Sequence, residues 1–303
     1  MISINENNKL NAKPFLKWAG GKTQLLNEIE GRLPKGISTG QITSYVEPFI
    51  GGGAVFFHIA QNYPNIKKFY LYDINNDLIN CYKTIQSNVY SLIESLRKLE
   101  AEFLPLNHND RKKVYLKIRK EFNRDKCEKH NPETMAKLIF LNKTCFNGLY
   151  RVNSKNEFNV PFGDYRNPKI CDEKNLLVVS EVLQKAEIIC GDFTKSRKYI
   201  RKNSFVYLDP PYRPLNGTAS FTSYSKDNFS EDDQIRLAGF CKEIKHIGAK
   251  FLLSNSDPKN ENIEDHFFED NFRGFDIQKV KASRVINCKA VGRGQISELL
   301  ITN

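Results

Sequence analysis

Short apolar runs rich in β-branched and aromatic residues alternate with helical patterns near the start of this chain and again towards its end. A run at 45–46 precedes a glycine cluster, and a second run at 67–72 ends on Asp73. Such alternation is typical of a parallel sheet whose crossover helices cover its faces, so we expect an α/β protein. The later part of the pattern comprises candidate strands at 187–190, 205–208, 251–253 and 298–301 and an amphipathic helix at 232–245.

The stretch between these two groups of strands has helical periodicity instead. Apolar residues from 76 to 99 keep the spacing of a long helix with one buried face. A charged helical stretch at 111–129 follows, and another helix is expected at 133–146. A charge run of this kind is most simply a solvated helix face. These patterns predict a discontinuous sheet domain at 13–80 and 175–303 and a mainly helical insertion at 81–174.

The composition narrows the classes of function. The 303 residues include 46 Lys plus Arg and 35 Asp plus Glu, a formal net charge of +11. This excess fits a polyanionic partner such as nucleic acid. No run of about 18 apolar residues occurs, so no membrane span is expected. Seven cysteines without a CxxC pair, and five histidines without the spacing of zinc ligands, favour a reducing cytoplasm and no structural metal.

Two glycine-containing segments suggest a nucleoside site. The segment 14–23 ends in Gly-Lys-Thr, but a phosphate-binding loop would need a glycine where Leu16 stands, which makes an NTPase unlikely. The segment 46–53 ends a strand with three glycines, and Asp73 follows about twenty residues later, where nucleotide-binding folds place an acceptor for ribose hydroxyls. The glycines do not match GxGxxG, so a nucleoside ligand without a pyrophosphate fits better. A tight glycine turn with Asp73 as a helix cap is the simpler alternative.

The tetrapeptide Asp209-Pro210-Pro211-Tyr212 follows the candidate strand 205–208 and therefore lies at a strand's carboxyl end, where open α/β sheets bind ligands. The prolines restrict the backbone, so the Asp209 carboxylate and the Pro210 carbonyl form a rigid pair of acceptors for the two hydrogens of an exocyclic amine. Tyr212 offers a ring for stacking. A proline turn beside a core tyrosine is the alternative for this segment by itself.

Together these segments resemble the DNA adenine methyltransferases of the Dam type, in the permuted class whose cofactor motif comes first. The resemblance spans about residues 13–300, and no motif is recognised between 99 and 132. It rests on Phe15-Leu16-Lys17-Trp18-Ala19-Gly20-Gly21-Lys22, on Glu47-Pro48-Phe49-Ile50-Gly51-Gly52-Gly53, on Asp73-Ile74-Asn75 and on 209–212. The segments 146–151 and 157–163 resemble the two arms of the hairpin with which that family reads DNA, and we call 146–163 the reading hairpin.

The resemblance implies a Rossmann-like, seven-stranded sheet that binds S-adenosylmethionine, with an inserted, mainly helical DNA-recognition domain. Position by position, it assigns the cofactor to Trp18, Lys22, Gly51, Asp73 and Asp209, with Asp192 and Phe193 at its adenine. It assigns catalysis to Asp209, Pro210 and Tyr212. It assigns DNA binding to Lys17, Phe146, Asn147, Leu149, Arg151 and Pro161, with Phe146 inserting into the base stack and GATC as the site. Arg151 could instead pair with a phosphate or with Glu157 across the hairpin.

The implied reaction is direct methyl transfer to the N6 amine of an adenine flipped out of duplex DNA, since a stacked base is out of reach. A covalent attack on a cytosine carbon would use a Pro-Cys dipeptide, and the sequence has none. Methylation of a cytosine amine or of RNA adenine, and a catalytically silent binder, are the alternatives. We expect a monomer, and the sequence leaves open whether a restriction endonuclease accompanies it. The Gly- and Ser-rich segment 217–229 is a candidate loop over the substrate.

Overall fold

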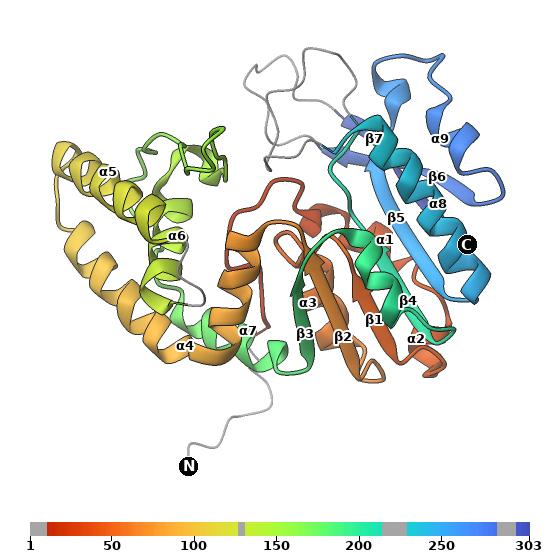
Figure 1. Ribbon diagram of the computed structural model, residues 1–303, viewed down its shortest axis with the longest axis horizontal. Helices are drawn as coiled ribbons and strands as arrows, with labels where there is room; N and C mark the ends of the chain where they lie inside the picture. The colour runs from red at the N-terminus through yellow and green to blue at the C-terminus, as the bar shows by residue number, and fades with distance from the viewer. Residues whose placement is uncertain (1–10, 127–130, 214–228, 284–294) are drawn as a thin grey trace.

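The computed structural model describes residues 11–126, 131–213, 229–283 and 295–303. In these residues a seven-stranded sheet has the order β3-β2-β1-β4-β5-β7-β6 (Figure 1). Strands β1 to β5 are parallel, and β7 runs antiparallel to both β5 and β6. The strands are β1 (Ser44–Glu47), β2 (Lys68–Asp73), β3 (Ala186–Cys190), β4 (Ser204–Leu208), β5 (Lys250–Ser256), β6 (Asp276–Ser283) and β7 (Gln295–Thr302).

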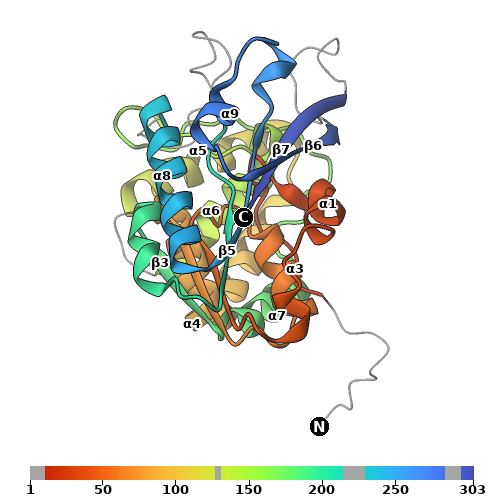
Figure 2. The same cartoon turned by 90° about the vertical axis from the view of Figure 1, so that its right-hand side faces the viewer.

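The central strands of the sheet are buried on both faces, and successive residues of β1 and β4 pack in different cores. Tyr45 and Phe205 pack in the core on one face, while Val46 and Val206 pack in the core on the other. Figure 2 shows α8 on one side of the sheet and α1, α3 and α7 on the other. The elements around the sheet are η2 (Lys22–Leu25), α1 (Leu26–Glu30), α2 (Gly36–Thr39), α3 (Ala54–Asn62), α7 (Glu173–Leu183), η4 (Phe193–Tyr199), α8 (Glu231–Ile247), η6 (Pro258–Asn260) and α9 (Phe267–Asn271).

A lobe of three helices stands beside the β3 edge of the sheet (Figure 1). It consists of α4 (Asn76–Phe103), α5 (His108–Asp125) and α6 (Pro132–Thr144). Helix α4 starts next to the sheet, where the Asn75 side chain accepts a hydrogen bond from the Leu78 N–H at 3.0 Å, and then runs out into the lobe. The predicted boundaries at 80/81 and 174/175 therefore fall inside α4 and inside the first turn of α7.

The charged stretch without a recognised motif is α5, and its inner face supports the return arm of the reading hairpin. Asn123 pairs with Phe158 as a strand would, donating to its carbonyl at 3.0 Å and accepting from its N–H at 2.7 Å. Tyr115 and Arg119 both donate to the Val160 carbonyl, at 2.8 and 3.1 Å. The charges of α5 thus lie on a helix whose other face holds the hairpin in place.

Most of the predicted elements are confirmed, and one strand was missed. The six candidate strands correspond to β1, β2, β3, β4, β5 and β7, and the predicted helices to α4, α5, α6 and α8. Strand β6 has the sequence DIQKVKAS, in which three apolar residues are unevenly spaced among polar ones, and it lies at the sheet edge beyond β7. Such a half-exposed edge strand lacks the apolar run that identified the others. Of the predicted loop 217–229, only Phe229 falls within the described residues.

Candidate active site

Asp209 follows the fully buried strand β4 and lies at the carboxyl end of the sheet. The Lys22 Nζ atom forms an ion pair with the Asp209 Oδ1 atom at 2.7 Å, and only 4% of the Lys22 side chain is exposed. The Ser254 hydroxyl, on the neighbouring strand β5, donates to the same carboxylate oxygen at 3.1 Å. The first glycine segment and the tetrapeptide, which lie almost 190 residues apart in sequence, are therefore joined by a direct contact between charged groups.

The protonation of Asp209 reflects two opposing effects. Burial raises the pKa of its carboxyl above the ordinary value, while the positive charge and the hydrogen bond of Lys22 act in the opposite direction. Lys22 is itself held by the Gly20 carbonyl, to which its Nζ donates at 3.0 Å. Lys22 thus favours the ionised form of Asp209, which is the form that can accept hydrogen bonds from an amine with both oxygens.

Tyr212 lies beside this ion pair, and β7 fixes its hydroxyl group. The Lys22 Nζ atom is 4.7 Å from the centre of the Tyr212 ring, and the Tyr212 hydroxyl donates to Glu298 Oε2 at 2.6 Å. Burial raises the pKa of Glu298, and the nearby charge of Asp209 raises it further against the effect of Lys22. The intervening Pro211 carbonyl accepts a hydrogen bond from the buried Gln234 of α8 at 2.9 Å. The tetrapeptide is therefore braced from both α8 and β7.

The glycine segment after β1, the end of β2 and Trp18 form a second group. The Asp73 carboxylate accepts from the backbone N–H groups of Gly51 and Asn75, at 3.1 and 2.9 Å. Gly51 has φ +46°, and a Cβ atom there would come within 3.1 Å of the Trp18 ring. Burial raises the pKa of Asp73 to about 6, although its backbone hydrogen bonds act in the opposite direction.

This group suits a nucleoside. The two backbone bonds leave acceptor positions on the Asp73 carboxylate, which can take up to about four hydrogen bonds, and these are what a pair of ribose hydroxyls requires. The glycine backbone and the half-buried Trp18 ring provide a flat wall beside it. Asp73 also caps no helix itself, since the side chain that caps α4 is that of Asn75.

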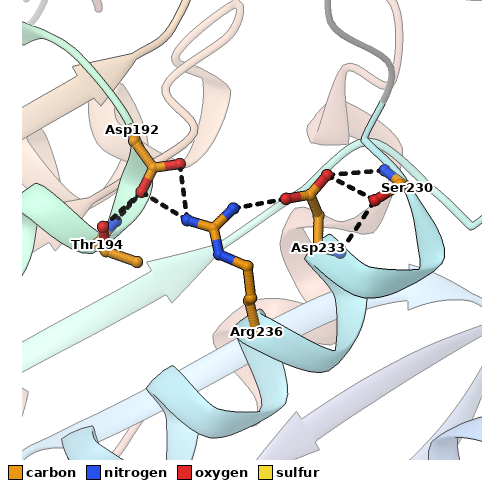
Figure 3. A network of polar contacts seen from close by, with 5 residues as sticks. All are labelled: Asp192, Thr194, Ser230, Asp233 and Arg236. Atoms are coloured by element: carbon orange, nitrogen blue, oxygen red, sulfur yellow. Dashed lines mark hydrogen bonds and ion pairs between the residues drawn. The ribbon is translucent and has the colours of Figure 1, made fainter.

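Asp192 and Phe193 follow β3, and Arg236 of α8 contacts both of them. Figure 3 shows the contact with Asp192. The Arg236 guanidinium bridges Asp192, at 3.2 Å, and Asp233, at 2.5 Å, and lies 5.1 Å from the centre of the Phe193 ring. Burial raises the pKa of Asp192, but hydrogen bonds from Thr194 and the charge of Arg236 outweigh it and lower that pKa. Asp192 therefore stays an anionic acceptor, as contact with an adenine amine requires.

Phe193 lies deeper than a ring that stacks freely on a base. It is buried and stacks on Phe49 of the glycine segment, with 5.4 Å between ring centres and 29° between planes. Phe49 thus links the end of β3 with the end of β1. The same helix α8 is well defined at both ends, because Ser230 and Asp233 form a reciprocal cap (Figure 3) and Gly248 ends the helix with φ +82°.

On the DNA-binding side, Lys17 and the reading hairpin form one unit through Asn142. The Asn142 side chain accepts from the Lys17 N–H at 2.8 Å and donates to the carbonyls of Lys17 and Gly148, each at 2.9 Å. Gly148 has φ +63°, and a Cβ atom there would lie 2.3 Å from the Lys17 side chain. Only a glycine allows the hairpin to approach Lys17 this closely.

The hairpin itself is antiparallel, with bridges between Cys145 and Phe162 and between Val152 and Phe158. Arg151 donates across it to the Asn159 side chain at 2.8 Å and to the Asn159 carbonyl at 3.2 Å. The alternative pairing with Glu157 is wrong, since Glu157 bonds Asn153 instead. The remaining predicted DNA-binding residues lie along the same surface: Phe146, Asn147 and Pro161 are exposed, and Leu149 is half-buried.

Several residues of the site had not been predicted. They are Asn142, Ser254, Glu298, Gln234 and the pair Asp77 and Lys126, all of which act through contacts between distant parts of the chain. One signal was present in the sequence. The apolar run of β5 ends in Ser254-Asn255-Ser256, and three polar residues that continue a buried strand indicate a site at its carboxyl end.

Within the described ranges, no group of His, Cys, Asp or Glu side chains could hold a metal ion. A search of the same ranges for helices long and apolar enough to cross a membrane finds none.

Comparisons with known proteins show what the chain is similar to. The model of the D12 class N6 adenine-specific DNA methyltransferase family matches residues 18–286. The type II methyltransferase M.MjaIII of Methanocaldococcus jannaschii is 52% identical over 97% of this chain and 100% of its own length. M1.LlaDCHI of Lactococcus lactis subsp. cremoris, also named a type II methyltransferase, is 38% identical over 100% of this chain and 99% of its own. The DNA adenine methylase of Vibrio cholerae is 36% identical over 95% of each chain.

Proposed function

The chain belongs to the D12 class of N6 adenine-specific DNA methyltransferases, and we propose that it transfers a methyl group from S-adenosylmethionine to an adenine flipped out of duplex DNA, within the sequence GATC. Its cofactor segment at 47–53 precedes its catalytic tetrapeptide at 209–212, which is the order of the permuted class. The family and the relatives favour DNA adenine over the alternatives of a cytosine amine or RNA.

The observation that carries the proposal is the contact of Lys22, Asp209 and Tyr212 at the end of β4. An adenine amine is a weak nucleophile because its lone pair is delocalised into the ring. Hydrogen bonds from this amine to the Asp209 carboxylate and the Pro210 carbonyl favour a pyramidal nitrogen. Lys22 and Ser254 both bind Oδ1, so the second oxygen of Asp209 remains as an acceptor for the amine.

Cofactor binding is proposed for Trp18, Gly51, Asp73, Asp192 and Phe193. Asp73 would accept from the ribose hydroxyls and Asp192 from the adenine amine, while the glycine backbone lets the nucleoside approach. S-adenosylmethionine supplies an electrophilic methyl group on its sulfonium. Asp209 is proposed for catalysis and, with Lys22, for the cofactor site, because their ion pair joins the first glycine segment to the tetrapeptide.

Tyr212 would stack on the flipped adenine, a contact typically worth about 1 to 3 kcal/mol per base. Its ring is already held on one side by the Lys22 cation and at its hydroxyl by Glu298. A ring fixed at both places loses little freedom when the base arrives, which favours capture of an extrahelical base.

Specificity for GATC is proposed from the unit formed by Lys17 and the reading hairpin. Arg and Lys suit the O6 and N7 acceptors of guanine, and the half-buried Leu149 suits a thymine methyl group. Phe146 and Asn147, exposed at the start of the reading hairpin, would occupy the space left by the flipped base. Arg151 uses its Nε and Nη2 groups within the hairpin, and its Nη1 group remains for a base.

Methylation of a GATC duplex and of its single-base variants tests the proposal, with wild-type protein and Arg151→Ala. Loss of a guanine contact should cost about 1 to 3 kcal/mol and relax discrimination at one base pair. Arg273→Ala, which removes an exposed arginine paired with Asp270, is the matched control. It should change neither the methylation of GATC duplexes nor the discrimination against the single-base variants. A loss that is equal on all duplexes would assign Arg151 to a phosphate. Wild-type protein that ignores GATC would refute the proposed site.

A restriction endonuclease acting on the same site is the proposed functional partner, because the relatives at 52% and 38% identity are both named type II methyltransferases. Extract of the host cells should then cleave unmethylated GATC duplexes and spare duplexes that this protein has methylated. An extract that cleaves neither would favour a solitary enzyme.

A further inference from the structure

A buried polar cluster joins the cofactor side of the molecule to the reading hairpin. The Asp77 Oδ2 atom accepts a hydrogen bond from the Tyr150 hydroxyl at 2.6 Å and forms an ion pair with Lys126 Nζ at 2.8 Å. Asp77 lies in the first turn of α4, Tyr150 in the reading hairpin and Lys126 at the end of α5. Their exposed fractions are 5%, 4% and 8%, so all three are withdrawn from solvent.

Tyr150 also contacts Trp18, which belongs to the group proposed to bind the nucleoside. Its ring stacks on Trp18, with 5.3 Å between ring centres and 30° between planes. Trp18 in turn lies against the backbone of Gly51 and Gly52. Asp77 is four residues beyond Asp73, the proposed ribose acceptor, so both partners of Tyr150 belong to segments that border the nucleoside group.

The side chains that precede and follow Tyr150 in sequence lie on the other side of the hairpin segment. Leu149 is half-buried and Arg151 exposed, whereas Tyr150 between them is buried, as expected for an extended segment whose side chains alternate. The side chain that faces the cofactor segment is thus flanked by the two side chains proposed to contact bases. A shift of Tyr150 moves both of them.

Stability alone does not explain this arrangement. A buried ion pair loses hydration at both charges, and apolar residues of similar volume often serve stability equally well or better. The cluster instead holds the Tyr150 hydroxyl at Asp77 and so gives the side chain a definite orientation, as buried polar groups do where they select a register.

We propose that Tyr150 is a positioning residue which, through Asp77, Lys126 and Trp18, sets the reading hairpin against the cofactor pocket, so that cofactor binding and recognition of the DNA site strengthen each other. This inference rests on the proposed function for the identity of the two ligands. A cofactor that immobilises Trp18 and the 73–77 segment restricts Tyr150, and Tyr150 then restricts Leu149 and Arg151. By linkage, bound DNA must favour the cofactor by the same factor.

The test measures this coupling factor. The duplex contains the site that the wild-type protein methylates, in its unmethylated form. Its dissociation constant is determined with and without saturating S-adenosylhomocysteine, for wild-type protein and for Tyr150→Phe. The variant keeps the stacked ring and loses the bond to Asp77. We expect a coupling factor of about 5 to 150 in the wild type, the usual range for linked sites, and a fall of at least about fivefold in the variant. Its affinity for S-adenosylhomocysteine without DNA should stay within about twofold of wild type.

Tyr63→Phe is the matched control, since it removes a tyrosine hydroxyl bonded to a carboxylate, that of Glu30, away from both sites. It should leave the coupling factor unchanged. A double variant, Asp77→Leu with Lys126→Met, removes both charges together, so neither is left buried without a partner, and it should reproduce the loss seen with Tyr150→Phe.

An unchanged coupling factor in a folded Tyr150→Phe protein would overturn the inference, and so would a wild type without coupling. A variant that only melts at a lower temperature, with its coupling intact, would likewise leave Tyr150 as a structural residue. The proposed GATC site can fail separately, because the coupling is measured on whichever duplex the wild-type protein methylates.

Discussion

Asn142→Ala should release Lys17 from the reading hairpin, the two parts of the surface proposed to read DNA. The Asn142 side chain is 1% exposed and makes three hydrogen bonds, all to backbone groups of Lys17 and Gly148. A hydrogen bond of this kind contributes about 1 kcal/mol net, so the three together correspond to about 3 kcal/mol of the free energy of unfolding. The loss also leaves three backbone groups to find new partners, which frees Lys17 from the hairpin.

The assay combines unfolding in urea with methylation of GATC duplexes and their single-base variants. We expect a lower unfolding midpoint at unchanged slope, and reduced discrimination at the base pair that Lys17 contacts. The matched control is Asn131→Ala at the other end of α6, where the side chain caps the helix by accepting from Glu133 and Thr134. This change should lower the free energy of unfolding by about 1 kcal/mol and leave the discrimination between GATC and its single-base variants unchanged.

A second substitution at the same position gives a pH signature. Asn142→Asp keeps the acceptor for the Lys17 N–H but turns a carboxylate oxygen toward two carbonyls. At neutral pH it should therefore lower the free energy of unfolding more than Asn142→Ala does. Burial raises the pKa of the introduced carboxyl in the folded state. The loss of unfolding free energy relative to wild type should therefore be largest above that folded pKa. It should shrink as the pH falls through this pKa, because the protonated carboxyl donates one hydrogen bond to a carbonyl. Asn142→Ala within about 1 kcal/mol of wild type, or an Asn142→Asp deficit independent of pH, would refute this reasoning.

Three further predictions concern the catalytic end of the sheet. Asp209→Ala should lower the rate of methyl transfer by about a hundredfold to a thousandfold or more in single-turnover assays, and a variant that keeps half the wild-type turnover would remove Asp209 from catalysis. Burial raises the pKa of Asp73 to about 6, so its carboxylate becomes protonated on acidification. The affinity for S-adenosylmethionine, measured by calorimetry, should therefore fall about tenfold from pH 7.5 to 5. Asp73→Asn should bind S-adenosylmethionine more weakly at neutral pH, and its affinity should depend less on pH. Glu298→Leu removes the acceptor of the Tyr212 hydroxyl and should reduce kcat about tenfold or more, while Glu298→Gln, which still accepts, should lose much less; equal effects would leave Glu298 as a packing residue.

The pattern of amino acids was enough to predict where the strands end and which chemical groups follow them. The glycines at 51–53, Asp73 and Asp209 each follow a short apolar run, and the carboxyl ends of parallel strands meet at one edge of a sheet. Local pattern and topology were therefore sufficient to bring the catalytic and nucleoside residues together. The edge strand β6 was missed because its apolar residues Ile277, Val280 and Ala282 form neither a continuous run nor a strict alternation.

The contacts that hold these groups in place could not be predicted in this way. Lys17 and Asn142 are 125 residues apart, and Asp77 and Tyr150 are 73 residues apart, yet each pair is joined by hydrogen bonds. A single asparagine in a helix, or a tyrosine between a leucine and an arginine, has no periodicity from which such a partner could be inferred. Periodicity reports which face of an element is buried, whereas the partner of a buried polar group depends on how the helical lobe docks on the sheet, which is a property of the whole chain.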